Sequence, residues 1–192
     1  MTGRKQFDVD RALDQVMTLF WQRGYAETSL DHIVSATGLG KGSLYGTFGG
    51  KPELFRRSLD RYADTYGRQY ETALSGRPTP ALAIQAFFEV VLARIADPEL
   101  PGGCLIALSA MAAPTLDDGN RDHVRALLDH QRQRVQAALE GSIPDANELA
   151  LFVTATNQAL AVLDRAGARA EQLASIVSVA VRAVEALTSG DG

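Results

Sequence analysis

The chain of 192 residues has a single cysteine, few prolines and no long run of uncharged apolar residues. The one cysteine, Cys104, excludes an internal disulfide and any zinc site built from several cysteines. The longest nearly apolar stretch, residues 81–96, is interrupted by Glu89 and Arg94, and the N-terminal residues lack the apolar segment of a secretory leader. We therefore expect a cytoplasmic protein without a membrane partner, and we predict no metal site and no cofactor.

The chain also lacks an excess of positive charge. Its net charge is −4, which argues against a protein that coats nucleic acid. The charges are unevenly distributed: residues 1–62 contain nine Lys or Arg against seven Asp or Glu, whereas residues 63–192 contain ten against sixteen. The sign of the first segment suits contact with DNA, although a chance fluctuation of a few charges explains it as well.

Proline is scarce, at 7 residues, while 46% of the residues are hydrophobic and 22% are charged. This composition is typical of a globular protein and favours helices. Apolar residues recur at three- and four-residue steps, which predicts an all-α fold of about nine helices. Their approximate bounds are 8–24, 30–37, 41–48, 51–73, 81–97, 104–112, 118–140, 145–165 and 169–187.

Residues 28–55 carry the pattern of two short helices joined by a turn. Ser29 can cap the first helix, and Gly38 ends it because glycine readily adopts the left-handed conformation of a helix C-terminus. Gly40 then gives the backbone freedom in the turn. A second short helix starts at Lys41. This is the layout of a helix-turn-helix that reads DNA.

The second short helix divides its residues between two faces. Leu44 and Phe48 stand four residues apart and so face the core. The polar side chains of the helix face solvent, where a lysine can reach a phosphate or a guanine edge and hydroxyls can touch bases or phosphates. The expected DNA contacts from this helix are Lys41, Ser43, Tyr45 and Thr47.

This segment resembles the DNA-binding domain of the TetR family of bacterial transcriptional regulators. The matching features keep their register over about fifty residues, roughly the first third of the chain. Beyond that third, only helix content and length agree with the family. The matching features are Phe20–Tyr25, Thr28–Leu30, Ile33–Val34, Gly38–Tyr45, Phe48, Lys51 and Leu54–Phe55.

The resemblance implies an N-terminal three-helix domain that binds DNA, residues 1–52, and a larger helical domain for effector sensing and dimerisation, residues 53–192. Thr28 and Lys51 match family positions that grip the DNA backbone. Gly42 lies within the matching run and is counted with the DNA-binding residues. Gly46 replaces a larger side chain that is usual in the family, which leaves the operator sequence open.

A single short reading helix makes too few contacts for specific binding, so such proteins bind as dimers on two half-sites. The expected partners are therefore a palindromic double-stranded DNA operator and a second copy of the chain. We assign the apolar stripes of the last two helices to the homodimer interface, as the resemblance also implies. The alternative is that these stripes serve only the core of one subunit. The interface candidates are Phe152, Val153, Leu160, Ile176, Val177, Val181 and Val184.

The signal that controls DNA binding is expected in the larger domain. Cys104 lies at the start of a helix, where unpaired amide groups favour the thiolate. Its Gly-Cys-Leu-Ile segment resembles a segment of some TetR-type regulators, among them ones whose cysteine senses electrophiles or oxidants. The alternative is a small buried residue in a tightly packed helix.

A small apolar or aromatic effector is the second candidate signal. Core packing explains its expected pocket residues equally well. These residues are Tyr66, Phe87, Phe88, Leu105 and Met111.

The sequence therefore predicts a TetR-type regulator, a repressor that is released from its operator by a small molecule or by modification of Cys104. The alternative function is a helical ligand carrier or an enzyme that uses the central helices. Such a protein would need convergent polar groups in the middle of the chain, and no catalytic constellation stands out there. We therefore expect no enzymatic activity.

Overall fold

The computed structural model of the chain describes residues 2–141, 143 and 145–189, with side chains from residue 9 on. Within these ranges it contains nine α-helices, one short 3-10 helix and no strand, which confirms the predicted all-α fold. The helices are α1 (Thr2–Arg23), α2 (Leu30–Thr37), α3 (Lys41–Phe48), α4 (Lys51–Leu74), α5 (Pro80–Ala96), α6 (Leu105–Met111), α7 (Asp118–Leu139), α8 (Ala146–Arg165) and α9 (Ala170–Ser189), and the 3-10 helix is Ala113–Thr115.

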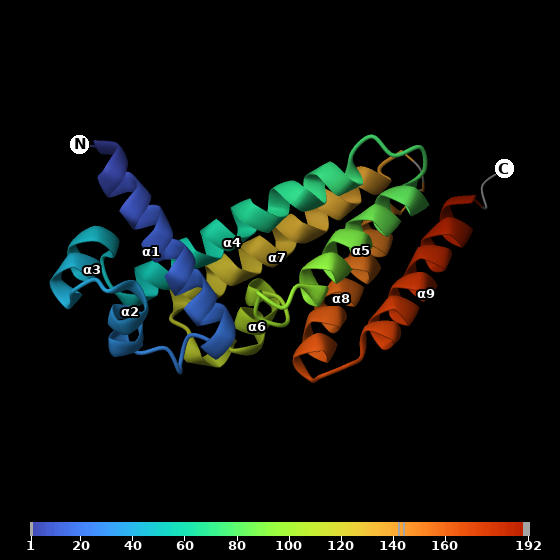
Figure 1. Cartoon of the computed structure of the whole chain (residues 1–192). Coiled ribbons are helices and arrows are strands. Elements are labelled where there is room, and N and C mark those ends of the chain that lie inside the picture. Colours follow the sequence, from blue (N-terminus) through green and yellow to red (C-terminus); the bar gives the residue numbers. More distant parts are fainter. Residues whose placement is uncertain (1, 142, 144, 190–192) are drawn as a thin grey trace.

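Figure 1 shows an elongated arrangement of these helices. α2 and α3 lie at one end, close to α1 and the start of α4, and α9 lies at the opposite end. α4 and α7 run side by side between the two ends, and they pack against each other. α5 packs between α4 and α9.

The head of the protein, α1 to α3, packs on the first turns of α4. Phe20 of α1 meets Phe55 of α4 edge to face, with ring centroids 5.0 Å apart. The buried apolar residues form one cluster that continues from the head into the body, the name used here for α4 to α9. The predicted domain boundary between residues 52 and 53 falls in the first turn of a continuous helix, and it remains a prediction.

The first helix differs from its prediction at one end. α1 begins at Thr2, whereas the apolar pattern predicts a start near residue 8. The residues before position 8 carry no apolar periodicity, so a pattern of buried positions has no signal there.

Two kinds of feature are absent from the part of the chain that the structure describes. No helix there combines the length and the apolar character that crossing a bilayer requires. No three His, Cys, Asp or Glu side chains in that part gather closely enough to hold a metal ion.

Candidate DNA interface and sensing core

Local capping shapes the two short helices and their turn. Ser29 Oγ accepts a hydrogen bond from the His32 N–H (3.1 Å), and His32 Nδ1 accepts one from the Ser29 N–H (3.2 Å), which completes a capping box. α2 ends at Gly38, whose φ of 69° is left-handed and whose N–H donates to the Val34 carbonyl. The φ of Gly40 is −67°, which any residue adopts, so the turn does not use the backbone freedom predicted for this position.

α3 has one apolar face and one polar face. Leu44 and Phe48 are 2% and 1% exposed and anchor the helix in the core. Tyr45 is 51% exposed. The continuous outer face is free to lie in a major groove. The other predicted DNA contacts on this helix are also exposed, namely Lys41, Gly42, Ser43 and Thr47.

The small residue at position 46 is not imposed by packing. A Cβ placed on Gly46 would meet no atom within 4 Å, and the same holds for Gly42. The fold therefore requires glycine at neither position. Because no side chain projects there, the outer face of α3 is flatter at these two positions. A DNA backbone or base edge can approach the helix closely at these two positions.

Lys41 begins α3 and pairs with Asp31 of α2. The Lys41 Nζ lies 2.7 Å from the Asp31 Oδ1, and the two side chains are 57% and 78% exposed. Their hydrogen bond lowers the pKa of Asp31 and raises the pKa of Lys41. An ion pair with this much exposure contributes little to stability in water. Asp31 thus holds Lys41 at the surface, where a DNA phosphate can compete for it.

Lys51 begins α4 and lies over the ring of Tyr25, with its Nζ 4.3 Å from the ring centroid. Burial lowers the pKa of the Lys51 ammonium. The contact with the aromatic ring fixes this cation beside the N-terminus of α4. Because the free amide groups of a helix N-terminus also attract anions, the position suits a phosphate contact.

The family resemblance predicts that Thr28 contacts a DNA phosphate, but the structure places its side chain in the interior. The residue is 0% exposed, and its hydroxyl donates to the Gly24 carbonyl at 2.7 Å. Its backbone N–H donates to the Tyr25 carbonyl. Thr28 therefore closes the turn between α1 and α2, and its side chain presents no surface to DNA in this conformation.

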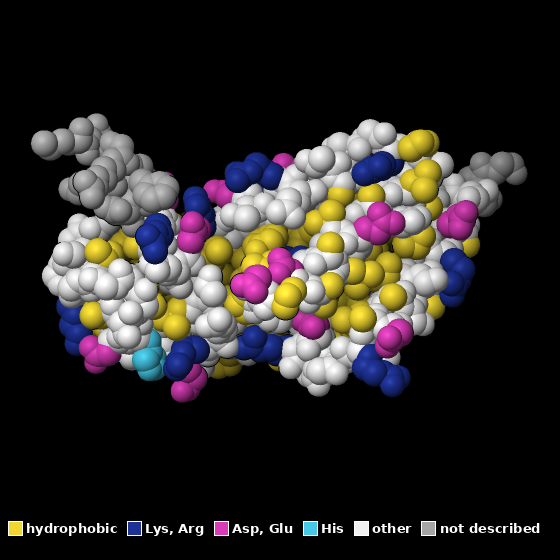
Figure 2. All heavy atoms as spheres, viewed as in Figure 1, with side chains coloured by type: hydrophobic (Ala, Val, Ile, Leu, Met, Phe, Trp, Pro, Cys, Tyr) yellow, Lys and Arg dark blue, Asp and Glu magenta, His cyan; other side chains and the backbone are white. Residues whose placement is uncertain are grey.

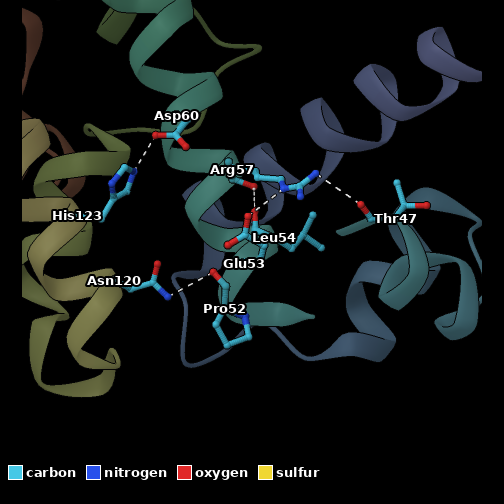
Figure 3. A network of polar contacts seen from close by, with 9 residues as sticks. Thr47, Pro52, Glu53, Leu54, Arg57, Asp60, Asn120 and His123 are labelled. Carbon is cyan, nitrogen blue, oxygen red and sulfur yellow. Dashed lines mark hydrogen bonds and ion pairs between the residues drawn. The ribbon is translucent and has the colours of Figure 1, made fainter. Parts of the chain in front are cut away.

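Arg57 of α4 attaches this part of the body to α3 (Figure 3). Its Nη1 donates to the Thr47 carbonyl at 3.5 Å, and its Nε pairs with Glu53 at 3.1 Å. The guanidinium also lies over the ring of Phe48, 5.8 Å from the centroid. These contacts connect α4 to the end of α3 that carries Thr47.

α7 is attached to the same half of α4 from the other side (Figure 3). Asn120 Nδ2 donates to the Pro52 carbonyl at 3.3 Å, and His123 Nε2 lies 2.7 Å from Asp60 Oδ1. The first half of α4 is thus held between α3 and α7. This arrangement provides a physical connection between the body and the reading helix.

The loop before α6 is contacted by three helices. Trp21 of α1 donates its Nε1–H to the Gly102 carbonyl at 3.2 Å. The Gly103 N–H donates to Asp164 of α8 at 2.6 Å, and Arg94 of α5 donates to the Gly103 carbonyl. The loop therefore connects the last part of α1 to α5 and α8 of the body.

Cys104 follows this loop and is a free thiol with 2% exposure. Tyr66 is buried at 7% exposure and meets the Trp21 ring with centroids 5.8 Å apart. Met111 is 64% exposed at the end of α6, so its predicted place in an internal pocket is wrong: only the opposite face of this short helix is covered. The remaining effector candidates lie in the core, namely Phe87, Phe88 and Leu105.

Sequence reasoning missed the polar residues inside the body. Arg94 and Asn157 are only 5% and 3% exposed. Gln131 and Arg134 line two internal cavities of about 10 Å³ each. In the sequence Arg94 stands only as an interruption of an apolar stretch. That interruption was itself a signal, because a charge in an otherwise apolar helix is costly to bury without a partner.

The predicted dimer interface is partly wrong. Val153, Leu160, Val177 and Val184 are at most 7% exposed within one protomer and pack in its own core. α8 and α9 are apolar on two faces, and periodicity does not distinguish the inner face from the outer one. Ile176 and Val181 are half-buried and Phe152 is 43% exposed. The exposed apolar residues of the two helices are Leu151, Phe152, Val162, Leu163, Val179 and Leu187.

Figure 2 shows how unevenly apolar side chains reach the surface. On the face in view, hydrophobic side chains gather on the half that carries α5, α8 and α9, and they are sparser over the head. Exposed apolar residues that recur along neighbouring helices are typical of a protein interface.

Profiles of known families match both parts of the chain. The profile described as "Bacterial regulatory proteins, tetR family" matches residues 12–57, and "Tetracyclin repressor-like, C-terminal domain" matches residues 80–183. The HTH-type transcriptional repressor ComR of Escherichia coli K12 is 33% identical over 190 residues, which cover 93% of this chain and 89% of ComR.

Solved structures agree with this similarity. The TetR family regulator CifR, in a cysteine-substituted form bound to 26-base-pair operator DNA, has 28% identity and a TM-score of 0.83 over 91% of this chain and 95% of its own. A TetR regulator from Chloroflexus aurantiacus has 29% identity and a TM-score of 0.84 over 95% and 96% of the two chains.

Proposed function

Because the chain belongs to the TetR family of transcriptional regulators, we propose that it is a homodimeric repressor that binds a palindromic operator and is released by a signal received in its body. The relative ComR is itself named a repressor. The protein acts in the cytoplasm, where it meets the chromosome, and it acts by binding and not as an enzyme.

The outer face of α3 carries this proposal. Its polar side chains are all exposed, while Leu44 and Phe48 anchor the helix below them. Lys41 and Lys51 bind phosphates, the Tyr45 hydroxyl donates a hydrogen bond to the DNA backbone, and Ser43 and Thr47 contact bases. The operator complex of CifR, which has a similar fold over most of its length, supports this use of the helix.

The second copy of the chain covers the exposed apolar face of α8 and α9. That face includes Phe152, Leu163 and Val179, at 43%, 37% and 54% exposure. It lies at the far end of the molecule from α3 (Figure 1), so a twofold pair leaves both reading helices uncovered. Two such helices can meet two half-sites about one turn of DNA apart.

The signal is either a small molecule in the body or covalent modification of Cys104. Either signal would act on the loop before α6, which contacts Trp21 of α1, and on α4, which connects the body to the head. A signal that binds more tightly to the form of the dimer with wrongly spaced heads weakens operator binding. The effect equals the difference in its affinity for the two forms of the dimer, and a coupling free energy of about 1 to 3 kcal/mol lowers the operator affinity roughly 5- to 150-fold.

A gel shift on DNA from upstream of the protein's own gene tests the proposal. We expect specific, salt-dependent binding to a palindrome. Lys51→Ala should weaken binding to all sequences about equally and reduce the slope of log affinity against log salt by about 1. Thr47→Ala should instead change the preference among related sequences by roughly 1 to 3 kcal/mol. The regulator function would be refuted if no palindrome were preferred.

Treatment of the bound complex with peroxide, hypochlorite or N-ethylmaleimide tests the role of Cys104. We expect release of DNA from the wild type and retention by Cys104→Ser. Release that is equal in both proteins would remove Cys104 as the sensor. Retention by both would do the same.

A further inference from the structure

Arg94 is a buried cation without a charged partner. It lies in the last turn of α5 and is 5% exposed. Its Nη1 donates to the Gly103 carbonyl, while Nε and Nη2 are buried and have no hydrogen-bond partner. No ion pair joins it to any carboxylate that the structure describes. Taking such a charge out of water is strongly unfavourable, so an explanation for it is needed.

The side chains around Arg94 are four aromatic residues and the thiol of Cys104. The guanidinium lies 5.7 Å from the ring centroid of Trp21 and 5.9 Å from that of Tyr66. The phenols of Tyr62 and Tyr70 and the Cys104 thiol are its other electrostatic neighbours, and the Tyr70 hydroxyl is close enough to share a hydrogen bond with Arg94. Burial raises the pKa of each of these three tyrosines, so their phenols stay uncharged at neutral pH. They can accept hydrogen bonds, but they cannot balance the charge.

Further polar groups near the tyrosines are buried without partners. These are the Tyr62 hydroxyl and the side-chain oxygens of Thr154 and Asn157 on α8. Tyr70 lines two cavities of about 10 Å³, and each has room for about one water molecule. Native cores rarely leave several polar groups without any partner, so this region can take up the polar atoms of water or of a ligand.

Arg134 of α7 separates these cavities from the surface. It lines both of them and also an open groove of about 540 Å³ beside the end of α4. Its Nε is held by Glu71 Oε1 at 2.8 Å. The guanidinium crosses α4 at Gly67, where an added Cβ would lie 2.8 Å from its Nη1. Movement of this one flexible side chain would connect the groove to the interior.

We propose that the region formed by the cavities beside Tyr62, Tyr66, Tyr70 and Arg134, together with the adjoining Arg94, here called the tyrosine chamber, binds a small aromatic carboxylate. The carboxylate pairs with the free N–H groups of Arg94, whose fork matches two carboxylate oxygens. The ring of the ligand packs among the tyrosine rings. The ligand enters past Arg134 and enlarges the cavities by displacing these side chains.

Binding would reach the head through Arg94 itself. The guanidinium that takes the carboxylate also holds the Gly103 carbonyl, and the same loop holds Trp21 of α1. A ligand that draws Arg94 away therefore loosens the attachment of α1. This consequence rests on the proposed function, because only a DNA-binding regulator converts it into operator release.

Tryptophan fluorescence tests the inference directly, because the chain has one tryptophan, and that residue, Trp21, lies beside Arg94. The full-length protein is titrated at constant ionic strength with benzoate and with benzamide, which keeps the ring but lacks the charge. We expect saturable binding of benzoate that is at least about tenfold tighter than that of benzamide. Arg94→Met should weaken benzoate binding by about 10- to 100-fold. The matched control Arg125→Met, whose side chain is 76% exposed, should leave it unchanged.

Three results would overturn the inference: no saturable response to benzoate, equal affinity for the two ligands, or tighter benzoate binding in Cys104→Ser. The last would mean that Arg94 serves an anion formed on Cys104, which competes with benzoate in the wild type. If Arg94→Met does not fold, Arg94→Lys keeps the charge without the fork and should bind benzoate about tenfold more weakly; unchanged affinity would count against the proposal. A gel shift without ligand checks operator binding separately, so the two proposals can fail independently.

Discussion

The outer face of α3 and the tyrosine chamber are both candidate binding sites, yet they are built in opposite ways. α3 keeps its polar residues in water and its apolar residues, Leu44 and Phe48, in the core. The chamber does the reverse: inside the body it holds the charge of Arg94, with two of its nitrogens unpaired, and the unpaired hydroxyl of Tyr62.

Because of this difference, stability and DNA binding depend on different residues in the head, whereas stability and ligand binding depend on the same residues in the body. On α3 a core residue and a contact residue are neighbours in sequence but point to opposite sides, so each can be changed alone. In the chamber the same side chains pack the core and present the unpaired groups. A ligand that satisfies those groups therefore changes how tightly the body is held together.

The largest effect should come from neighbours on α3. Leu44→Ala removes a side chain that is 2% exposed and should lower the free energy of unfolding by roughly 2 to 5 kcal/mol. Tyr45→Ala, one residue further, should change it by less than about 0.5 kcal/mol while it weakens operator binding. Urea unfolding and gel shifts measure the two effects. Equal loss of stability in both variants would contradict the division of faces.

The next effect concerns the apolar face at the far end of the body. Phe152→Glu should convert the dimer to a monomer and weaken operator binding by about 100-fold or more, since one reading helix then meets the DNA alone. Leu82→Glu is a matched control, because Leu82 of α5 is 45% exposed against 43% for Phe152. Sedimentation measures the mass. A Phe152→Glu protein that stays dimeric would place the interface elsewhere.

A smaller effect on stability is expected at Arg94. Arg94→Met removes an unfavourable buried charge but leaves the Gly103 carbonyl without its donor, so the free energy of unfolding should stay within about 1 kcal/mol of the wild type. Thermal and urea unfolding without ligand measure it. A loss of about 3 kcal/mol or more would instead make Arg94 a structural residue of the loop before α6.

The smallest effect is expected at the entrance of the chamber. Gly67→Ala should gain about 0.5 to 1 kcal/mol of helix stability and lose most of that when the added Cβ displaces Arg134 from Glu71. The net change should be less than about 0.5 kcal/mol, with faster entry of benzoate in stopped-flow fluorescence. The nearby control Thr65→Ala, on the same helix, should leave the entry rate unchanged. Slower entry in Gly67→Ala would contradict the role of Arg134.

Much of the head could be predicted from local patterns. Ser29 and Gly38 cap α2 as expected, and the four-residue spacing of Leu44 and Phe48 orients α3, because capping and helical spacing act over a few residues. Thr28 is the exception. Its burial depends on how α1 meets α2, which no local pattern records.

Less of the body could be predicted. Phe152 and Val153 are neighbours in one apolar stripe, yet one is exposed and the other buried. Met111 and Leu105 lie on one short helix, with one outside and one in the core. An apolar residue satisfies either position, so only the packing of α8 against α7 and α9, and of α6 against α7 and α8, decides which face of each helix is covered.

The sequence by itself determined the helices, the reading face of α3 and the family resemblance, because those depend on spacing within a few turns. Only the tertiary structure decided that Arg94 is a buried charge with no counterion among the described residues and that Arg134 lies between the groove and the interior. Burial and pairing are properties of side chains brought together from α4, α5, α7 and α8. No stretch of sequence contains them.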